Sequence, residues 1–313
     1  MPHDFPTLQT IRSGGKAALA RALALVETAD GTDALASLLD AALLDPIGAV
    51  LGLTGPPGVG KSTLTNTLIQ RARGAGQTVG VIAVDPSSQV TGGALLGDRT
   101  RLRTNPDDTG VFVRSMAARD RLGGLSDHAV AALVLMRAVY DRVIVESVGV
   151  GQSEGDIAAV ADTVLLLIQP GSGDSLQFMK AGIMELPDIV AVTKADMGEA
   201  ARRAEADVAG AMTLTDPGRA PVPVLRVSAA SGMGVDDLIA ALAARGQAAA
   251  ATGEHARRRR AQARTWVCDR IRRRFGTEGL LAIDVDSVLA ASPGPFSAIV
   301  AITETLRSRL ALT

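Results

Sequence analysis

The most restrictive feature of the chain is the stretch from Val50 to Thr65, which reads VLGLTGPPGVGKSTLT. Its apolar start predicts a buried strand, and Leu64, Leu68 and Ile69 mark the core face of a helix. Between them, the sequence fits G-x-x-x-x-G-K-[ST] in the strand–loop–helix context that this phosphate-binding loop requires. An ordinary glycine-rich turn is the alternative, but it would not need all four fixed residues. The stretch therefore predicts a nucleoside triphosphate site.

The residue types in this loop have chemical reasons. Glycines allow backbone N–H groups to close round a phosphate at the positive end of the following helix. Lys61 is expected to reach the β- and γ-phosphates, and the Ser62 hydroxyl to bind Mg²⁺. The residues predicted to contact the nucleotide here are Gly55, Pro56, Pro57, Gly58, Val59, Gly60, Lys61, Ser62 and Thr63.

Composition limits the class of protein. Of 313 residues, 47% are hydrophobic, which is enough for a sizeable core, and the net charge of −1 gives no global argument for nucleic acid or an anionic membrane. The single cysteine, Cys268, excludes an intrachain disulfide framework. The N-terminus does not resemble a signal peptide, and no apolar run approaches the ~20 residues of a membrane span. We therefore expect a cytoplasmic protein that binds neither nucleic acid nor membrane.

Beyond the loop, short apolar runs alternate with helical patterns. Strands are expected at residues 79–84, 111–113, 142–145, 163–168, 189–192 and 224–227. Helices are expected at 127–140, 174–184, 199–212 and 235–244. This alternation predicts an α/β fold, a P-loop NTPase with a mostly parallel central sheet flanked by helices. Ligands in such folds gather at the carboxyl ends of strands.

Helical segments flank this region on both sides, which predicts an N-terminal helical extension (1–46), a nucleotide-binding domain (47–247) and a C-terminal helical arm (248–313). The first segment, 8–45, is broken near residues 30–33, and the last helix is expected at 297–310. Nine arginines lie between residues 257 and 274, which suits either nucleic-acid binding or a solvated helix face. An apolar stripe on the same helix favours an interface, and Gly276 is expected to end that helix. The stripe consists of Ala263, Trp266, Val267, Ile271 and Phe275.

Acidic residues follow two of the predicted strands. Asp85 could hold a metal-bound water or simply cap the turn before Pro86. Glu146 is followed by x-x-Gly, ending at Gly149, which matches the metal-binding and γ-phosphate-sensing element of GTPases with Glu in place of Asp. The Gly149 N–H could contact the γ-phosphate and release it on hydrolysis.

Two further loops suggest guanine. Thr193-Lys194-Ala195-Asp196 is similar to the guanine-reading N-K-x-D motif, with Thr in place of Asn. Asp196 would accept hydrogen bonds from two ring-edge donors that adenine does not present, and the Lys194 stem would lie over the base. Ser228-Ala229 follows the next strand, where GTPases carry a base-contacting loop, and Ala230 replaces the usual Lys or Leu. A turn is the alternative for the tetrapeptide alone, but its placement favours GTP over ATP.

Together these residues resemble the methylmalonyl-CoA-mutase-associated GTPases of the MeaB/ArgK type, over nearly the whole chain. The blocks that carry the resemblance are GPPGVGKST (55–63), AVDPSSQVTGGALLGDRTR (83–101), VRSMAARDRLGGL (113–125), VESVGVGQSE (145–154), PGSGDSLQFMKAGIMEL (170–186) and TKAD (193–196). Asp120-Arg121 depart from the family pattern, where Gly-His is common, which affects partner contacts and switch behaviour.

The resemblance implies a metallochaperone that uses GTP binding and hydrolysis to gate adenosylcobalamin delivery to, and protection of, an acyl-CoA mutase. It implies Mg²⁺ bound by Ser62, Asp85, Asp98 and Glu146, and homodimerisation through the C-terminal arm. It also implies an additional switch at residues 171–180, with functional positions at Asp174, Gln177 and Lys180.

The catalytic residues are expected to be Lys61, Asp98, Glu146, Gln152 and Lys180. Gln152, Asp174 and Lys180 are candidates to position water, although each could equally be a solvated loop residue. Slow hydrolysis, accelerated by the mutase, is the expected behaviour. The alternative is a kinase that phosphorylates a transport protein, the older interpretation attached to the ArgK name, but no H-R-D-like block is present.

Overall fold

The structure, a computed structural model, describes residues 5–85, 102, 104–105, 107–117, 125–147, 153–171, 183–215 and 221–310. The chain forms two compact units, one of residues 1–48, 127–141 and 256–313 and the other of residues 49–126 and 142–255. The predicted N-terminal extension and most of the predicted C-terminal arm are thus grouped in one unit. None of the described helices combines the length and the apolar character needed to cross a membrane.

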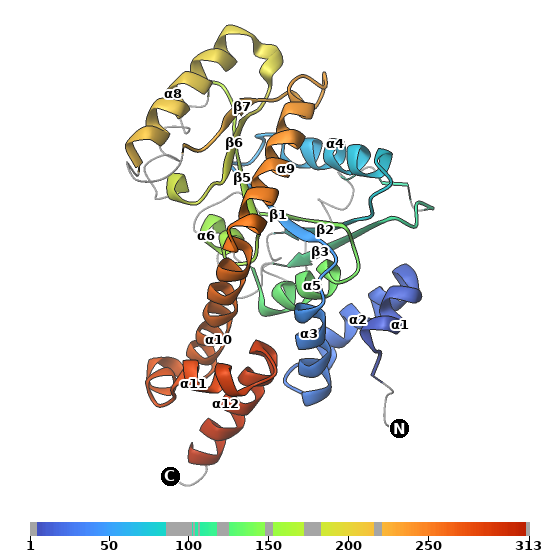
Figure 1. Cartoon of the computed structure of the whole chain (residues 1–313), viewed down its shortest axis with the longest axis vertical. Coiled ribbons are helices and arrows are strands. Elements are labelled where there is room, and N and C mark those ends of the chain that lie inside the picture. Colours follow the sequence, from blue (N-terminus) through green and yellow to red (C-terminus); the bar gives the residue numbers. More distant parts are fainter. Residues whose placement is uncertain are drawn as a thin grey trace, which may run out of the picture. The chain divides into compact units, whose positions relative to one another are not determined.

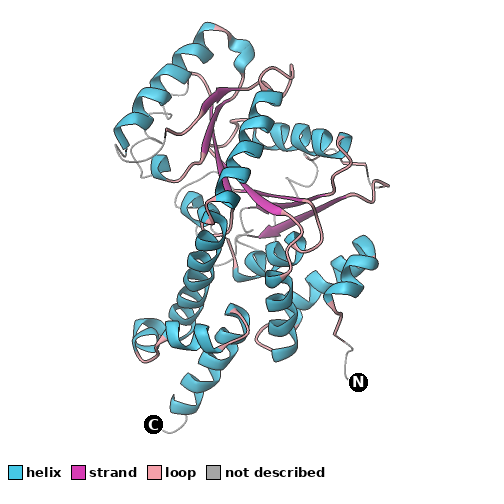
Figure 2. Ribbon diagram, in the orientation of Figure 1, coloured by secondary structure: helices cyan, strands magenta, loops and turns pink. Residues whose placement is uncertain are grey.

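The second unit is built on a seven-stranded sheet, which Figure 1 labels and Figure 2 shows in magenta. The strand order is β3-β2-β4-β1-β5-β6-β7, and all six pairings are parallel, which confirms the predicted α/β class. The strands are β1 (Ala49–Thr54), β2 (Val79–Asp85), β3 (Val111–Ala117), β4 (Arg142–Glu146), β5 (Thr163–Ile168), β6 (Ile189–Val192) and β7 (Val224–Arg226).

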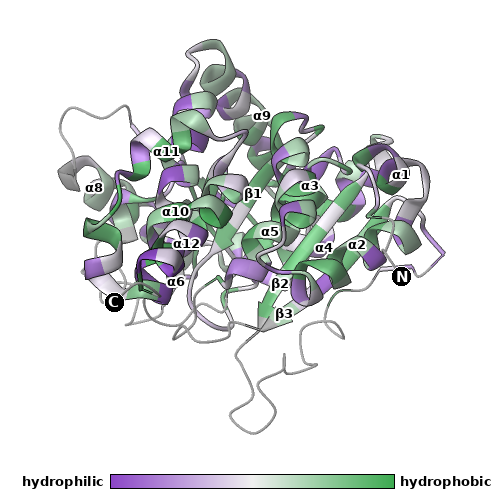
Figure 3. Cartoon of the chain, turned by 90° about the horizontal axis from the view of Figure 1, so that it is seen from below, coloured by the Kyte–Doolittle hydropathy of each residue, from purple (hydrophilic) through white to green (hydrophobic). Residues whose placement is uncertain are grey.

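Helices cover both faces of this sheet, as the continuous apolar runs require. Within β5, Leu165 and Leu167 pack with residues of α4 (Lys61–Gly74) and α9 (Val235–Ala251). The alternate residues, Leu166 and Ile168, pack with α8 (Glu199–Thr215). Figure 3 shows β1 and β2 largely in the green of hydrophobic residues. Strand β5 is therefore held by side chains on both of its faces.

Several elements differ from the predictions in extent. β3 runs to Ala117 rather than 113, and α9 runs to Ala251 rather than 244. The short helix α6 (Ser153–Ala158) was not predicted, because six residues give too little periodicity to detect. The helix expected at 174–184 falls mostly outside the described residues. Its last two residues, 183 and 184, belong to the short 3-10 turn η1 (Ile183–Glu185). A second such turn, η2 (Ala195–Met197), follows β6.

The first unit is helical. Its helices are α1 (Leu8–Ser13), α2 (Gly15–Thr28), α3 (Asp33–Leu44), α5 (Asp127–Arg137), α10 (Glu254–Leu281, which starts two residues before this unit), α11 (Val285–Ala291) and α12 (Pro295–Leu310). The predicted break before residue 33 is present. Helix α10 is interrupted at Gly276, whose φ of 70° is not helical, as predicted for a helix end, but a further helical segment follows.

The apolar stripe of α10 lies inside this unit. Val267 and Ile271 are completely buried and pack with Val285 of α11 and with Ile302 and Leu306 of α12. Helix α11 was not predicted, and although a helix was expected at 297–310, its pairing with the stripe was not predicted either. The stripe therefore gives no support to the predicted dimer interface, because its central residues already have intramolecular contacts.

Buried and half-buried charges join distant segments of the same unit. Asp40 of α3 is 2% exposed, and its carboxylate accepts hydrogen bonds from the backbone N–H groups of Phe296 (3.0 Å) and Ser297 (2.9 Å) at the start of α12. Arg270 of α10 pairs with Asp127 at 2.5 Å and with Asp30. Some arginines of α10 thus have structural partners, which weakens the nucleic-acid alternative.

Candidate nucleotide site

The loop between β1 and α4 has the backbone that its glycines were expected to provide. A Cβ on Gly55 would lie 2.4 Å from the carbonyl oxygen of Leu167, so no larger residue fits there. Gly60, with a φ of 102°, precedes the first turn of α4, and no side chain caps that helix. The first N–H groups of an α-helix have no partner within the helix. The start of α4 is therefore an uncapped, positively polarised anion site.

Lys61 lies at this helix start with its ammonium folded against the loop. Its Nζ donates to the carbonyl oxygens of Gly55 (2.8 Å) and Pro56 (3.1 Å), and the residue is only 9% exposed. Both acceptors are neutral. A phosphate oxygen is a stronger partner for an ammonium because the hydrogen bond becomes charge-assisted at both ends. Lys61 is therefore placed to exchange loop carbonyls for a phosphate.

Glu146 meets α4 from the neighbouring strand. Leu53 of β1 pairs in register with Glu146 of β4, which brings the carboxylate level with the start of the loop. Its Oε1 accepts from the Ser62 hydroxyl at 2.9 Å and its Oε2 from the Thr65 hydroxyl at 3.3 Å. Thr65 was not predicted, although its position three residues after Ser62 places both on one side of the helix.

The predicted metal ligands are brought together in part. Ser62 and Glu146 are joined, and they provide hydroxyl and carboxylate oxygens, the ligand type that Mg²⁺ prefers. Asp85 is the last residue of β2 at the carboxyl edge of the same sheet. In the part of the chain that the structure describes, no group of three or more His, Cys, Asp or Glu could hold a metal. The predicted residues that lie outside the described part are Asp98, Gly149, Gln152, Asp174, Gln177 and Lys180.

The loop after β6 lies against β5. Both the N–H and the hydroxyl of Thr193 donate to the carbonyl oxygen of Ile168, at 2.7 and 3.1 Å. Lys194 has a left-handed φ of 54°, and its Nζ donates to Gln169 Oε1 at 2.7 Å. Gln169 follows β5 and was not predicted as a site residue. Its contact depends on β5 and β6 being neighbours, which the pattern of strands alone does not specify.

Asp196 is exposed and its carboxylate is held in its charged form. A hydrogen bond from the Ser228 side chain, followed by one from its own backbone N–H and by the charge of Lys194, lowers the pKa of Asp196. The N–H of Ala195 also donates to the carbonyl oxygen of Val227 at 3.2 Å, so the loops after β6 and β7 are joined. An ionised carboxylate accepts hydrogen bonds and donates none, which suits the N–H edge of guanine.

Helix α4 links this base loop to the phosphate loop. The Thr67 hydroxyl, on the same helix as Lys61 and Ser62, lies 3.4 Å from the carbonyl oxygen of Ala229 and 3.2 Å from that of Thr63. Ala229 is half-buried and Ala230 is exposed. Thr67 thus connects the loop after β7 to the helix that begins with Lys61 and Ser62.

The family called Methylmalonyl Co-A mutase-associated GTPase MeaB matches residues 19–278. The chain belongs to this family. A MeaB-family assignment confirms the resemblance seen in the sequence, and with the parallel sheet it confirms the expected class of P-loop GTPase.

Individual relatives agree with the MeaB assignment. A putative GTPase of Pyrococcus horikoshii is 48% identical over 190 residues, and the matched region covers only 60% of either protein. The mouse mitochondrial protein called methylmalonic aciduria type A homolog is 37% identical over 228 residues, or 71% of this chain and 55% of the mouse protein. A crystal structure described as LAO/AO transport system kinase has a TM-score of 0.69 and 26% identity, and covers 96% of each chain.

Proposed function

We propose that this MeaB-family chain binds GTP together with Mg²⁺, hydrolyses it slowly, and couples that cycle to a cobalamin-dependent acyl-CoA mutase. The observation that supports nucleotide binding is that residues predicted for the phosphate loop and for one base loop contact the same helix, α4. Lys61 and the Ser62–Glu146 pair lie at its start, and the loop that follows β7 contacts it through Thr67. These contacts support a phosphate site at the start of α4 and a base-binding loop attached to the same helix.

The loop between β1 and α4 would bind the phosphates together with Lys61. The uncapped N–H groups at the start of α4 would donate to the β-phosphate, and Lys61 would leave Gly55 and Pro56 for the β- and γ-phosphates. These groups are already in place, so little reorganisation is needed when negative charge shifts towards the leaving oxygen. Such preorganised donors are the usual source of rate acceleration in phosphoryl transfer.

Magnesium would be held by the Ser62 hydroxyl directly and by Glu146 through water, with Asp85 and Asp98 as further predicted ligands. The Ser62–Glu146 contact of 2.9 Å supports the first two assignments. When bound, Mg²⁺ neutralises charge on the phosphate oxygens. Thr65 would keep one oxygen of Glu146 fixed while Ser62 turns to the ion, because its hydroxyl contacts the other oxygen.

Base selection would fall to Asp196. Its ionised carboxylate would accept from the two N–H donors on the guanine edge, whereas adenine offers no such pair there. Gln169 would hold the Lys194 ammonium so that the stem of Lys194 can cover the base. Thr193 contacts β5 rather than the phosphate loop, so the link between the two half-sites would depend on Thr67 and Ala229.

The partner part of the proposal is supported by the family description, which names methylmalonyl-CoA mutase, and by the mouse relative's name. We propose that the nucleotide state gates adenosylcobalamin delivery to the mutase and protects it. Homodimerisation through residues 248–313 and a cytoplasmic location remain predictions of the same proposal.

Two assays test the proposal. Calorimetry of the full chain with Mg²⁺ should show GTP bound in preference to ATP. Mutase captured by a tagged chain from the source organism should then raise GTP turnover and show GTP-dependent transfer of adenosylcobalamin, followed by its absorption spectrum. The Lys61→Ala variant is the control for both. Preference for ATP would overturn the nucleotide assignment, and turnover unaffected by the captured mutase would overturn the partner assignment.

The name of the solved relative, LAO/AO transport system kinase, favours a second function, protein phosphorylation. A kinase needs a base that accepts the proton of the attacking hydroxyl. Glu146 is the carboxylate that the described residues place beside the phosphate loop, and both its oxygens already accept hydrogen bonds from α4. We therefore expect labelled γ-phosphate to appear as free phosphate rather than on protein.

A further inference from the structure

A separate cavity lies within the second unit, on the face of the sheet that α4 and α9 cover. Its volume is about 340 Å³, and it lies over the amino-terminal halves of β1 and β4, from Ala49 to Leu51 and from Arg142 to Ile144. The nucleotide residues lie at the opposite, carboxyl ends of the strands. None of the cavity's lining residues is a residue assigned above to GTP or Mg²⁺.

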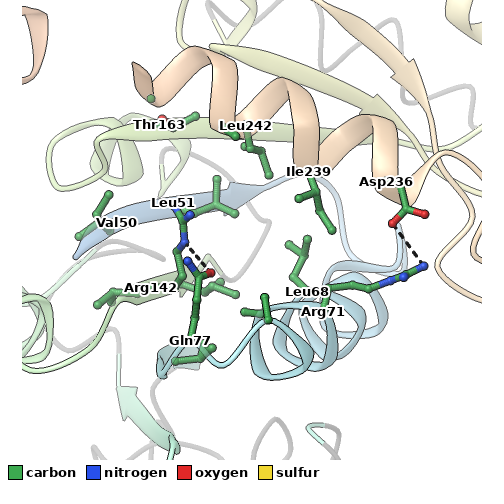
Figure 4. Close-up of a pocket in the computed structure, with 18 of the residues that line it drawn as sticks. Val50, Leu51, Leu68, Arg71, Gln77, Arg142, Thr163, Asp236, Ile239 and Leu242 are labelled. Carbon is green, nitrogen blue, oxygen red and sulfur yellow. Dashed lines mark hydrogen bonds and ion pairs between the residues drawn. The ribbon is translucent and has the colours of Figure 1, made fainter. Parts of the chain in front are cut away.

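The walls of this cavity are apolar. Figure 4 shows Leu51 of β1, Leu68 of α4, and Ile239 and Leu242 of α9 around the central space. Ligand pockets usually measure about 300–1,000 Å³ and are lined mainly by hydrophobic side chains with a few polar groups at fixed places. Water gains little in such a space, because it needs two to four polar partners. The cavity therefore suits a small molecule with an apolar body.

Two arginines lie at its rim. Arg71 is 3.4 Å from Asp236, and both side chains are substantially exposed. The Nε of Arg142 donates to the amide oxygen of Gln77 at 3.2 Å, and no carboxylate of the described residues forms an ion pair with Arg142. Figure 4 shows these two pairs on different sides of the space. Since Gln77 is neutral, the rim carries one positive charge that no neighbouring acid among the described lining residues balances.

We propose that this cavity binds a small amphipathic carboxylate, with its hydrocarbon part against Leu51, Leu68 and Leu242 and its carboxylate on the Arg142 guanidinium. A guanidinium offers parallel N–H donors that match the two oxygens of a carboxylate. A neutral ligand of the same shape would gain the apolar contacts but leave the arginine's remaining donors to water. An alkylammonium would meet like charge at the rim.

A matched ligand series tests this assignment. Calorimetry of the full chain should show octanoate binding at least about threefold more tightly than octanol, since an ion pair with the exposed Arg142 contributes up to about 1 kcal/mol. Octylammonium should bind more weakly than both. Equal binding of octanoate and octanol, or no binding of octanoate, would overturn the proposal.

Two variants locate the site. Arg142→Gln should weaken octanoate binding about threefold and leave octanol binding unchanged, whereas Arg203→Gln, a change of an exposed arginine on α8, should alter neither. Ala243→Phe, at a position of α9 that lines the cavity, should fill it and abolish both interactions while GTP still binds. Octanoate binding that survives Ala243→Phe would place the ligand elsewhere and refute the assignment. If that variant does not fold, Arg142→Gln alone decides.

The Lys61→Ala variant separates this proposal from the nucleotide proposal. Its octanoate affinity should equal that of the unaltered chain, because Lys61 lies at the other end of α4 from the cavity. A failure to bind GTP would then not affect the octanoate result. A failure to bind octanoate would likewise not affect the GTP result.

Discussion

Buried charged side chains at the two edges of the central sheet have different kinds of hydrogen-bond partner. At the amino edge, Asp162 and Asp188 are buried and each is bound to a neighbouring strand. Asp162 accepts from the N–H of Val50 at 2.8 Å and donates its own N–H to the carbonyl of Val50 at 2.9 Å. Asp188 makes the same pair of contacts with Val164, at 2.8 and 2.9 Å. At the carboxyl edge, Lys61 and Glu146 are also buried, but they hydrogen-bond to neutral carbonyls of the phosphate loop and to hydroxyls of α4.

Under the proposed function, the difference distinguishes structural charges from ligand-binding charges. The amino-edge aspartates hydrogen-bond to the backbone of neighbouring strands, and Arg245 adds an ion pair to Asp188 at 2.8 Å. We expect the hydrogen bonds of Lys61 and Glu146 instead to be exchanged for contacts with a phosphate or a cation while the sheet stays intact. Substitutions at the carboxyl edge should therefore change ligand binding, and those at the amino edge should change stability.

The largest effect is expected from Lys61→Ala. The ammonium would make charge-assisted hydrogen bonds to the phosphates, so its loss should lower GTP affinity about a hundredfold, or by about 2.8 kcal/mol. Turnover should fall with it. Calorimetry and a phosphate-release assay measure both, and Lys16→Ala, a lysine of α2, serves as the control. Unchanged turnover would show that the phosphate site lies elsewhere.

Asp188→Ala tests the other edge. The change removes the acceptor for the Val164 N–H and one of the two carboxylates that pair with Arg245. Because Glu254 stays with Arg245, we expect a loss of about 3 kcal/mol in the free energy of unfolding, at the low end for a broken buried pair. Urea unfolding measures it.

The control for that experiment is Asp236→Ala, which breaks an exposed pair with Arg71 and should cost less than about 1 kcal/mol. GTP affinity of folded Asp188→Ala should be unchanged. A large loss of GTP affinity without loss of stability would contradict the division between the two edges.

Asp196→Asn should change which base is bound. The carboxylate accepts from both guanine donors, and an amide replaces one acceptor with a donor, which should cost about tenfold in GTP affinity. Xanthine, which presents an oxygen where guanine has its amino group, should gain. Competition between GTP and XTP measures the switch, with Asp207→Asn on α8 as control. Retained preference for GTP would remove Asp196 from the base site.

The sequence indicated which residues follow the strands at the carboxyl edge, but it gave no signal at the amino edge. The phosphate loop, Glu146 and Asp196 each follow a strand, and the rule that parallel strands end at one edge places them on the same edge of the sheet. Thr65 and Gln169 were missed because their contacts depend on strand order and on register, such as the pairing of Leu53 with Glu146. Asp162 and Asp188 precede strands, where an acid gives no signal of its partner. The stripe of α10 was interpreted as an interface because α11, a seven-residue helix, has too weak a pattern to predict and because the pairing of α10 with α12 is not encoded in either helix's own pattern.

Thr67 gives the smallest expected effect and the finest test of the carboxyl edge. Its hydroxyl contacts Ala229 at 3.4 Å, a long hydrogen bond, and also Thr63 of its own helix. Thr67→Val keeps the shape and removes the hydroxyl, so GTP affinity should fall only two- to threefold, at the low end for one neutral hydrogen bond. Thr67→Ser keeps the hydroxyl and should bind GTP normally. Thr193 is held by β5 instead of the phosphate loop. Under the proposed function, the Thr67–Ala229 contact therefore connects the base loop to the phosphate loop. Pyrophosphate affinity should therefore be equal in the unaltered chain and in both variants. If Thr67→Val also lowered the affinity for pyrophosphate, the hydroxyl would support the phosphate loop rather than the base loop.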